Sequence, residues 1–356
     1  MLDPIATGRD WERFALPSRI PPGWARALVC SVLLMWPWAP SGARVDPVTR
    51  PSLTLKTGQR SVRVVAFSPD GRQVALAGDG GEVEVWDISA ARRLRTVKGS
   101  SPVFTVAFSP DGKYLAASND EKKISISPLQ GAGLPSSFDV PGGPVYSIGY
   151  TPDGMRIAAG CRDGVIRLYS TDGQLLHSFG DIVSGISVID SPGGTRIAGL
   201  EGQGVRMWDA QTGELVLTRE LDMSPWLPRH ALHTGLTPFP VFQLSPEAGF
   251  AAGAGDPEPG ASPPGLYRMI AWNTVSGKTT TELGVGWPVY EFSRRGDRIA
   301  VSSLAGISVI DVETWKELHR YFAGQQIVVR SLGFSPDAKW IAAGDDHGRV
   351  RIWKVD

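Results

Sequence analysis

Short apolar stretches separated by turn residues recur along most of this 356-residue chain. Residues 62–67, 72–78, 82–88 and 92–98 show the pattern, because their apolar side chains alternate with polar ones or run continuously over short distances. Alternation is typical of half-buried strands, and short continuous runs are typical of buried strands. The pattern therefore predicts an all-β chain built from short strands.

A repeated phrase separates the first two strands of this pattern. Ala-Phe-Ser-Pro-Asp-Gly occurs at 66–71 and 107–112, with variants at 150–154 and 333–338. Ser and Asp side chains bond nearby backbone groups, Pro fixes φ at about −65°, and Gly tolerates a positive φ. The phrase thus predicts a tight reversal of the chain. A catalytic role would require its aspartates to converge, whereas repetition around a ring would keep them about one blade apart.

Looser copies of this turn bring the number of repeats to seven. The copies are marked by Ser68, Ser109, Thr151, Ser191, Ser245, Ser293 and Ser335. Successive copies are 41, 42, 40, 54, 48 and 42 residues apart. A period of about 40–45 residues, with four short strands in each, is typical of a repeat architecture. We predict a seven-bladed β-propeller of four-stranded antiparallel blades.

The third strands of the repeats carry a family resemblance. Val-Trp-Asp at 85–87, Met-Trp-Asp at 207–209 and Arg-Ile-Trp at 351–353 resemble the strand ends of WD40 β-propellers. The resemblance covers residues 52–356 and implies a rigid platform for a protein or peptide partner. The Gly-His dipeptide of the family is missing from every repeat. We therefore expect its buried His–Ser–Trp–Asp network to be incomplete and the blades to depend more on apolar packing.

The two ends of the propeller region predict how the ring closes. The last repeat stops just after a third strand, and residues 52–58 match the fourth-strand segment 94–100. We expect this amino-terminal strand to complete the last blade, because that arrangement removes an exposed pair of sheet edges. Leu53 and Leu55 would then be structural residues.

The first 43 residues have the pattern of a targeting segment. Four arginines precede the apolar run 27–39, and small residues follow at 40–43. This order is typical of a secretory signal, and the run is shorter than the roughly 20 residues that cross a bilayer. We predict a signal peptide or targeting tail at 1–43, a linker at 44–51 and the propeller at 52–356.

These segments also predict location and redox state. A functional signal would export the chain to the periplasm or the extracellular space, and otherwise the chain is cytoplasmic. Cleavage near Ala43 would leave Cys161 as the only cysteine, so no intramolecular disulfide could form.

Two segments interrupt the repeat, and both border the fifth blade. Residues 222–240 lie between blades four and five, and residues 254–265 lie between the second and third strands of blade five. Antiparallel alternation predicts that both emerge on the same face. Aromatic side chains and arginine often anchor protein interfaces. The candidate partner-binding residues are Trp226, Arg229, His230, His233, Phe239 and Tyr267. Alternatively, these segments are tolerated insertions whose aromatic side chains cover blade five.

Composition and motifs favour a binding protein over an enzyme. The chain has 36 basic and 36 acidic residues, so its net charge gives no indication of nucleic acid or an anionic membrane as partner. Phosphate-binding, nucleophile-elbow and zinc-protease motifs are missing. His230 and His233, with Asp256 or Glu258, provide too weak a pattern for a metal site. We expect no catalytic residue, metal or cofactor, and a monomeric propeller.

One alternative from another class remains. A propeller enzyme, such as a metal-assisted hydrolase or a lactonase-like protein, would assemble its site at the central channel from distant blades. Three or more converging carboxylate, His or amide ligands would identify it. Charged residues inside strands, as in 81–87 and 164–170, are predicted to occupy the polar side of exposed strands.

Overall fold

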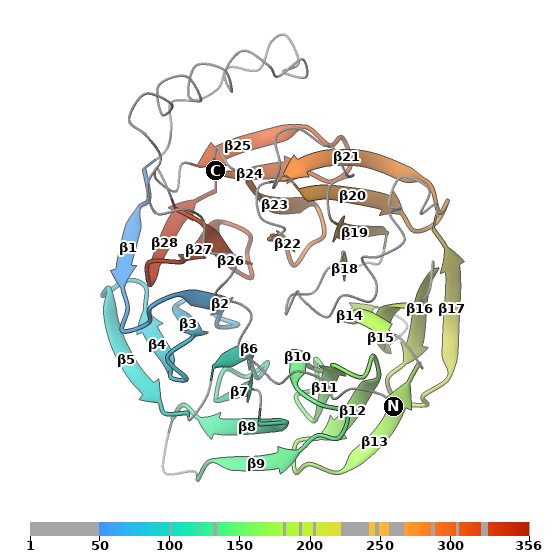
Figure 1. Cartoon of the computed structure of the whole chain (residues 1–356), viewed down its shortest axis with the longest axis horizontal. Helices are drawn as coiled ribbons and strands as arrows, with labels where there is room; N and C mark the ends of the chain where they lie inside the picture. The colour runs from blue at the N-terminus through green and yellow to red at the C-terminus, as the bar shows by residue number, and fades with distance from the viewer. Residues whose placement is uncertain are drawn as a thin grey trace, which may run out of the picture. The chain divides into compact units, whose positions relative to one another are not determined.

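Seven four-stranded antiparallel sheets account for the strands that the structure describes, and they follow one another around a ring (Figure 1). The structure is a computed structural model. It describes residues 50–99, 102–119, 121–130, 134–180, 183–191, 194–201, 204–221, 242–245, 249–255, 267–285, 289–303, 306–321 and 327–355. The predicted seven-bladed propeller is confirmed. These residues belong to one compact unit, Asp46–Asp356.

Each blade contains four strands that are consecutive in the chain, except the last. Blade 1 contains β2 (Val62–Phe67), β3 (Gln73–Gly78), β4 (Val83–Asp87) and β5 (Arg92–Val97). Blade 2 contains β6 (Val103–Phe108), β7 (Tyr114–Asn119), β8 (Lys123–Pro128) and β9 (Ser136–Asp139). Blade 3 contains β10 (Val145–Tyr150), β11 (Arg156–Cys161), β12 (Ile166–Ser170) and β13 (Leu175–Phe179).

The next three blades follow the same order. Blade 4 contains β14 (Val183–Ser191), β15 (Gly194–Glu201), β16 (Gly204–Asp209) and β17 (Leu215–Glu220). Blade 5 contains β18 (Phe242–Leu244), β19 (Phe250–Gly255), β20 (Tyr267–Asn273) and β21 (Thr279–Val285). Blade 6 contains β22 (Tyr290–Phe292), β23 (Arg298–Ser303), β24 (Gly306–Asp311) and β25 (Glu317–Tyr321).

Blade 7 joins the two ends of the propeller unit. Its order is β1 (Leu53–Lys56), β28 (Arg349–Lys354), β27 (Trp340–Asp345) and β26 (Val329–Phe334), from the outer edge inward. Leu53 pairs with Ile352 and Leu55 pairs with Val350 in antiparallel register. Leu55 is buried beside Val350 and the blade 1 residue Val62. The predicted closure by an amino-terminal strand is therefore confirmed.

The Ser-Pro-Asp-Gly phrase forms the turn between the first and second strands. In blade 1, the Ser68 hydroxyl donates to Asp70 Oδ1 at 2.6 Å, and the Arg72 amide donates to the same oxygen at 3.0 Å. Gly71 takes a positive φ of 69°. The predicted reversal is confirmed. In blade 7, Ala338 replaces the glycine and still takes a φ of 57°, which is a strained conformation for a residue with a Cβ.

Apolar side chains fill the space between neighbouring blades. Val65, on the inner strand of blade 1, packs with Ala342 and Ile352 of blade 7. Ala66, the next residue, packs with Val106 of blade 2. Successive side chains of a strand point to opposite faces of its sheet, so each blade contributes to two cores. Stability arises at the seams between blades.

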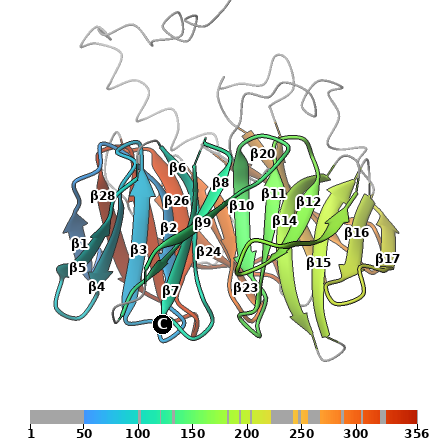
Figure 2. The same cartoon turned by 90° about the horizontal axis from the view of Figure 1, so that it is seen from below.

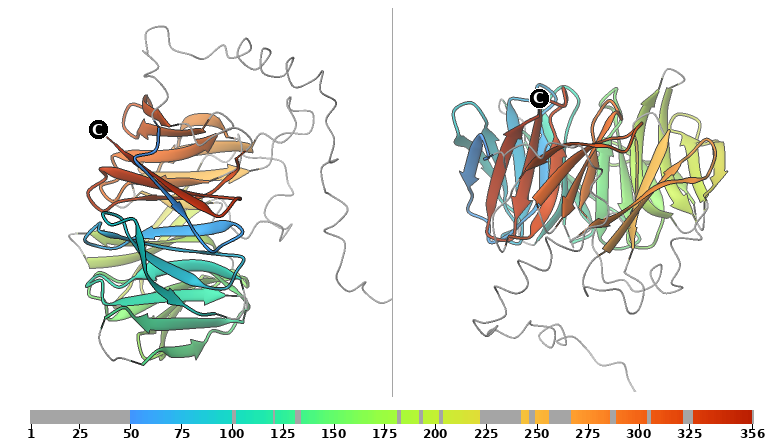
Figure 3. Two further views of the ribbon diagram at one scale, coloured as in Figure 1. Left: turned by 90° about the vertical axis from the view of Figure 1, so that its left-hand side faces the viewer. Right: turned by 90° about the horizontal axis from the view of Figure 1, so that it is seen from above.

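The strands run between two faces of the ring (Figure 2). We call one the turn face, because it contains the Ser-Pro-Asp-Gly turns such as 68–71. We call the other the crossover face. It contains the starts of the inner strands, the turns between second and third strands, and the crossings from blade to blade. Figure 3 shows the same arrangement from two further sides. The described residues contain no helix with the length and apolar content of a membrane span.

Candidate functional site

The blade 5 segments that the sequence singles out fall mostly outside the described residues. Trp226, Arg229, His230, His233 and Phe239 are not described, and neither are Asp256 and Glu258. Tyr267 begins β20, but its side chain is not described. The flanking strand ends lie at the crossover face, as antiparallel pairing requires. The six candidate partner-binding residues, which do not include Asp256 and Glu258, therefore remain a predicted binding site.

In the described part of the crossover face, several inner strands begin with a β-bulge near the ring axis. Five inner strands contain an irregularity close to their first residue. In β14 it lies between Ser184 and Ser187, and in each of the other four a single residue has no partner on the neighbouring strand. Such a β-bulge redirects the side chain of the extra residue. The extra residues are Arg63 in β2, Phe104 in β6, Tyr146 in β10 and Arg330 in β26. None of these four residues was predicted from the sequence, although each one follows the first valine of its inner strand.

Two of these extra residues form an aromatic pair. The Phe104 and Tyr146 rings are 5.3 Å apart at their centroids, with an angle of 71° between their planes. This edge-to-face geometry is favourable for aromatic rings. Both side chains are half-buried, so part of their surface remains accessible. The pair crosses from blade 2 to blade 3 and presents apolar surface at the crossover face.

The other two extra residues are arginines of adjacent blades. The Arg63 guanidinium forms an ion pair with Asp79, which lies just beyond the end of β3 at the same face. The Arg63 side chain is 33% exposed and Asp79 is 35% exposed. Arg330 occupies the corresponding place in blade 7 and is half-buried. The inner margin of the crossover face thus combines accessible aromatic and cationic groups.

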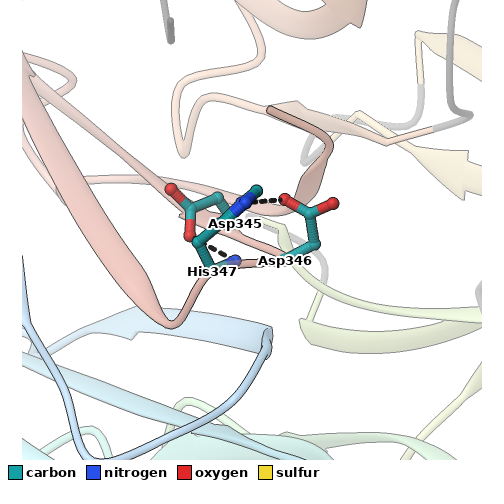
Figure 4. Close-up of side chains that lie close together, drawn as sticks. All are labelled: Asp345, Asp346 and His347. Carbon is teal, nitrogen blue, oxygen red and sulfur yellow. Dashed lines mark hydrogen bonds and ion pairs between the residues drawn. The ribbon is translucent and has the colours of Figure 1, made fainter. Parts of the chain in front are cut away.

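Asp345, Asp346 and His347 form the one group of three potential metal ligands found among the described residues (Figure 4). Asp345 Oδ1 accepts from the His347 and Arg349 amides, both at 2.9 Å, and its other oxygen pairs with Arg351. Asp346 Oδ1 accepts from the Val328 amide at 3.1 Å and contacts His347 Nδ1 at 2.8 Å. These contacts hold the turn between β27 and β28. The buried arginine makes the group a poor cation site, so it does not support the enzyme alternative.

Glu84 corrects one prediction from the sequence. It was expected on the polar side of an exposed strand, yet it is 0% exposed. Its two oxygens accept from the Gly58 amide and from Trp86 Nε1, both at 2.8 Å. Arg93 lies 3.6 Å away. Glu84 therefore fastens blade 1 to the segment that follows β1, and no alternation rule could have revealed this long-range partner.

The turn face offers little free chemistry, because its repeated carboxylates are engaged locally. Hydrogen bonds from Ser68, Ser109 and Ser335 lower the pKa of the aspartates two residues later. Those aspartates are Asp70, Asp111 and Asp337. The structural role predicted for the phrase is confirmed at these turns.

The described cysteine and two of the described histidines also make contacts within the ring. Cys161 is a buried free thiol, and burial raises its pKa. His177 lies in the outer strand of blade 3, with Nε2 3.3 Å from the Gln211 carbonyl of blade 4. His319 lies in β25 and stacks on Tyr321. Ser127 and Ile310 occupy the third-strand position that holds Trp86 in blade 1 and Trp208 in blade 4, and both are 5% exposed.

The comparisons with known proteins agree with this architecture. The family described as "WD domain, G-beta repeat" matches residues 135–170 and 315–354. Each match begins at or near the outer strand of one blade and ends at or near the third strand of the next, so the repeat is offset from the blade. Residues 48–127, from β1 to β8, are similar to the family described as "Eukaryotic translation initiation factor eIF2A". The comparison with curated proteins found no match. With two matched repeats and seven four-stranded blades, the chain is a WD40-repeat β-propeller.

Proposed function

We propose that this propeller is a non-catalytic scaffold that binds a protein or peptide partner through its crossover face. The observation that carries the proposal is the Phe104–Tyr146 pair beside Arg63 at the starts of three consecutive inner strands. Aromatic residues and arginine contribute most to the affinity of protein interfaces. The WD40 repeats support a binding role, and the eIF2A similarity covers only residues 48–127, from β1 to β8.

The two faces differ in what they offer a partner. On the turn face, aspartates such as Asp70 and Asp111 already bind serine hydroxyls and backbone amides. A partner would have to compete with these local bonds, which also shape the turn. On the crossover face, the aromatic pair can bury further surface without breaking a hydrogen bond. This difference favours the crossover face.

A double substitution on each face tests the proposal. Phe104→Ala with Tyr146→Ala removes the aromatic pair, and Arg72→Ala with Lys113→Ala removes two exposed cations of the turn face. Proteins recovered with the wild type would be quantified by mass spectrometry. We expect a partner that is lost with the first variant and kept with the second, at similar melting temperatures. Equal recovery with both variants would contradict the proposal.

The blade 5 segments extend the proposed binding face. The strand ends that flank residues 222–241 and 256–266 belong to the crossover face, and the first segment contains Trp226, Arg229 and Phe239, residue types that anchor interfaces. Trp226→Ala with Arg229→Ala should therefore abolish recovery of the same partner without lowering the melting temperature. Retained binding would restrict the interface to the inner strands.

We also propose that the scaffold acts after export. The support is the order of arginines, an apolar run at 27–39 and small residues at 40–43. Amino-terminal sequencing of the protein from cell fractions measures this directly. A mature chain that begins near residue 44 outside the cytoplasm is expected. An intact amino terminus in the cytoplasm would refute export and leave the binding proposal unaffected.

A further inference from the structure

Positive charge is concentrated on the outer rim of blades 7 and 1, although the chain as a whole is neutral. Residues 52–58 and 88–99 contain five lysine and arginine residues and no acidic residue. These segments include β1 and β5, the outermost strands of the two blades, which follow one another along the rim (Figure 1). The five residues are all exposed, and they are Lys56, Arg92, Arg93, Arg95 and Lys98. The neutral total therefore conceals a cationic surface.

Nearby acidic groups compensate only part of this charge. Arg93 lies 3.6 Å from the buried Glu84. Arg92 is the register partner of Asp87, whose Oδ1 already accepts two local hydrogen bonds. Arg95 forms no ion pair with another of the described residues. Its exposed guanidinium is therefore available to a carboxylate from outside the chain.

A hollow opens beside Arg95, at the seam between blades 1 and 2. Its volume is about 360 Å³, which falls in the range of roughly 300–1,000 Å³ found for ligand pockets. Leu94, which is 40% exposed, provides part of its apolar surface. The lining residues come from β3, β4, β5 and the segment after β8, and they are Gln73, Val85, Leu94, Arg95, Leu129 and Gln130.

A bulge in β5 brings two consecutive side chains to this hollow. Val85 pairs with Arg95 and Trp86 pairs with Arg93, so Leu94 is an extra residue without a partner on β4. In a regular strand, neighbouring side chains point to opposite faces of the sheet, and a bulge changes that alternation. Leu94 and Arg95 consequently both line the hollow, where they combine apolar surface with a charge.

The same bulge recurs in four other outer strands, but its chemistry differs there. In blades 3, 4, 5 and 6 the extra residues are Leu176, Val216, Thr280 and Leu318. Histidine, leucine or threonine follows each of these, whereas arginine follows Leu94. The blade repeat therefore does not require the arginine. Its position beside an apolar hollow indicates a binding role in blade 1.

We propose that a rim site, formed by Arg92, Leu94, Arg95 and Leu129, binds an acidic peptide that carries an apolar side chain. The apolar side chain enters the hollow beside Leu94 and Leu129, and a neighbouring carboxylate pairs with the Arg95 guanidinium. Two parallel hydrogen bonds from an arginine to a carboxylate provide both affinity and a fixed orientation. The other cations of the rim attract an acidic partner through their field.

The lining of the hollow favours a peptide over a nucleic acid. Proteins hold single-stranded nucleic acids by stacking the bases on aromatic side chains. None of the residues that line this hollow is aromatic. Leu94 and Leu129 instead match an aliphatic side chain, because burying apolar surface on both partners is favourable. A polyanion without apolar groups would meet the cations and leave the hollow unfilled.

Fluorescence anisotropy with the full chain and a fluorescein-labelled peptide tests the proposal. The peptide alternates glutamate with leucine, and a second peptide replaces each leucine with serine at the same charge. We expect saturable binding of the first peptide that weakens at high salt, and weaker binding of the second. Equal affinity for the two peptides, or no binding of the first, would overturn the proposal. Tighter binding of an oligouridylate of equal charge would also overturn it and would assign the rim to nucleic acid.

Single substitutions locate the binding on the rim. Arg95→Ala and Leu94→Ser should each weaken binding of the leucine peptide about tenfold, since each removes one of the two contacts at the centre of the site. Leu318→Ser is the matched control, because Leu318 is the extra residue of the blade 6 bulge and is 41% exposed. It should keep the wild-type affinity, and all three variants should keep the melting temperature. An equal loss in Leu318→Ser would overturn the proposal.

This rim site is separate from the binding function proposed above. Leu94 and Arg95 belong to the outermost strand of blade 1, whereas Phe104 and Tyr146 lie at the starts of inner strands. The peptide assay uses no partner of the crossover face. Failure of either proposal therefore leaves the other unaffected.

Discussion

Two seams of this ring join neighbouring blades by different means. At the seam between blades 7 and 1, the Ser331 hydroxyl donates to the Val62 carbonyl at 3.2 Å, and Gly344 leaves space for the Val62 side chain. Between blades 5 and 6, Gln243 Nε2 donates to Glu291 Oε2 at 2.9 Å, and the Tyr290 hydroxyl donates to the Ala252 carbonyl at 3.2 Å. The first seam combines close packing with one side-chain hydrogen bond. The second is linked by polar side chains, so the same blade geometry accommodates two kinds of contact between neighbouring blades.

Removing the closing strand should produce the largest effect on this comparison. Deleting residues 44–58 removes β1, exposes an edge of β28 and withdraws Leu53 and Leu55 from their apolar contacts. We expect the free energy of unfolding to fall by about 4 kcal/mol or more, since the buried Leu55 contributes roughly 2 kcal/mol, the half-buried Leu53 contributes less, and strand pairing is lost as well. Calorimetry gives the melting temperature. A chain lacking only residues 44–49 is the control, and an unchanged melting temperature in the longer deletion would refute closure by β1.

Exchanging the small and polar residues of the two seams should produce the next largest effect. Gly333→Gln places a long amide where a Cβ alone meets the Val65 carbonyl. We expect a loss of about 3 kcal/mol in urea unfolding, because overpacking and an unpaired buried amide both destabilise. Glu291→Gln at the equivalent place in blade 6 should remain folded at pH 6. Equal losses in the two variants would show that the seams do not differ.

The hydrogen bond at the tight seam should contribute a smaller amount. Ser331→Ala leaves the buried Val62 carbonyl without the serine donor and should cost about 1 kcal/mol. Ser89→Ala removes an exposed hydroxyl that bonds Asp87 and serves as the control, with an expected change under about 0.5 kcal/mol. Both values come from urea unfolding at pH 6. If Ser331→Ala matches the control, close packing alone holds this seam.

The smallest single-site effect is expected at the turns, and it should depend on pH. Hydrogen bonds from serine lower the pKa of Asp70, Asp111 and Asp337. A lowered folded pKa stabilises the protein above the unfolded value of about 3.9 and loses that contribution as the pH falls below it. Asp337→Asn should therefore reduce the melting temperature slightly at pH 6 and much less at pH 3. A reduction that is as large at pH 3 would contradict this origin of the stabilisation.

Much of the architecture could be predicted because its signals are local. The turn phrase around Ser68 needs only its own side chains and backbone, and its period counts the blades. The first blade was predicted within one residue at each strand end. Closure by residues 52–58 followed from a missing fourth strand in the last repeat. These features depend on residues that are close together in the sequence or on a repeated pattern.

The candidate site could be predicted only in part, because its contacts join different blades. Phe104 and Tyr146 are 42 positions apart and meet because two bulges direct them to one face. Glu84 reads as a surface residue of an alternating strand but is buried by partners from the segment after β1. The blade 5 residues such as Trp226 were selected because they interrupt the repeat, and their role as a binding site stays a prediction.

By itself, the sequence determined the all-β class, the seven repeats, the turn chemistry and the strand that closes the ring. Those properties arise from local backbone preferences and from a period that each blade repeats. Only the tertiary structure decided which inner strands approach closely, which partners bury Glu84 and which side chains line the crossover face. The distance between blades sets the space and the solvation of each side chain, and no single repeat contains that information.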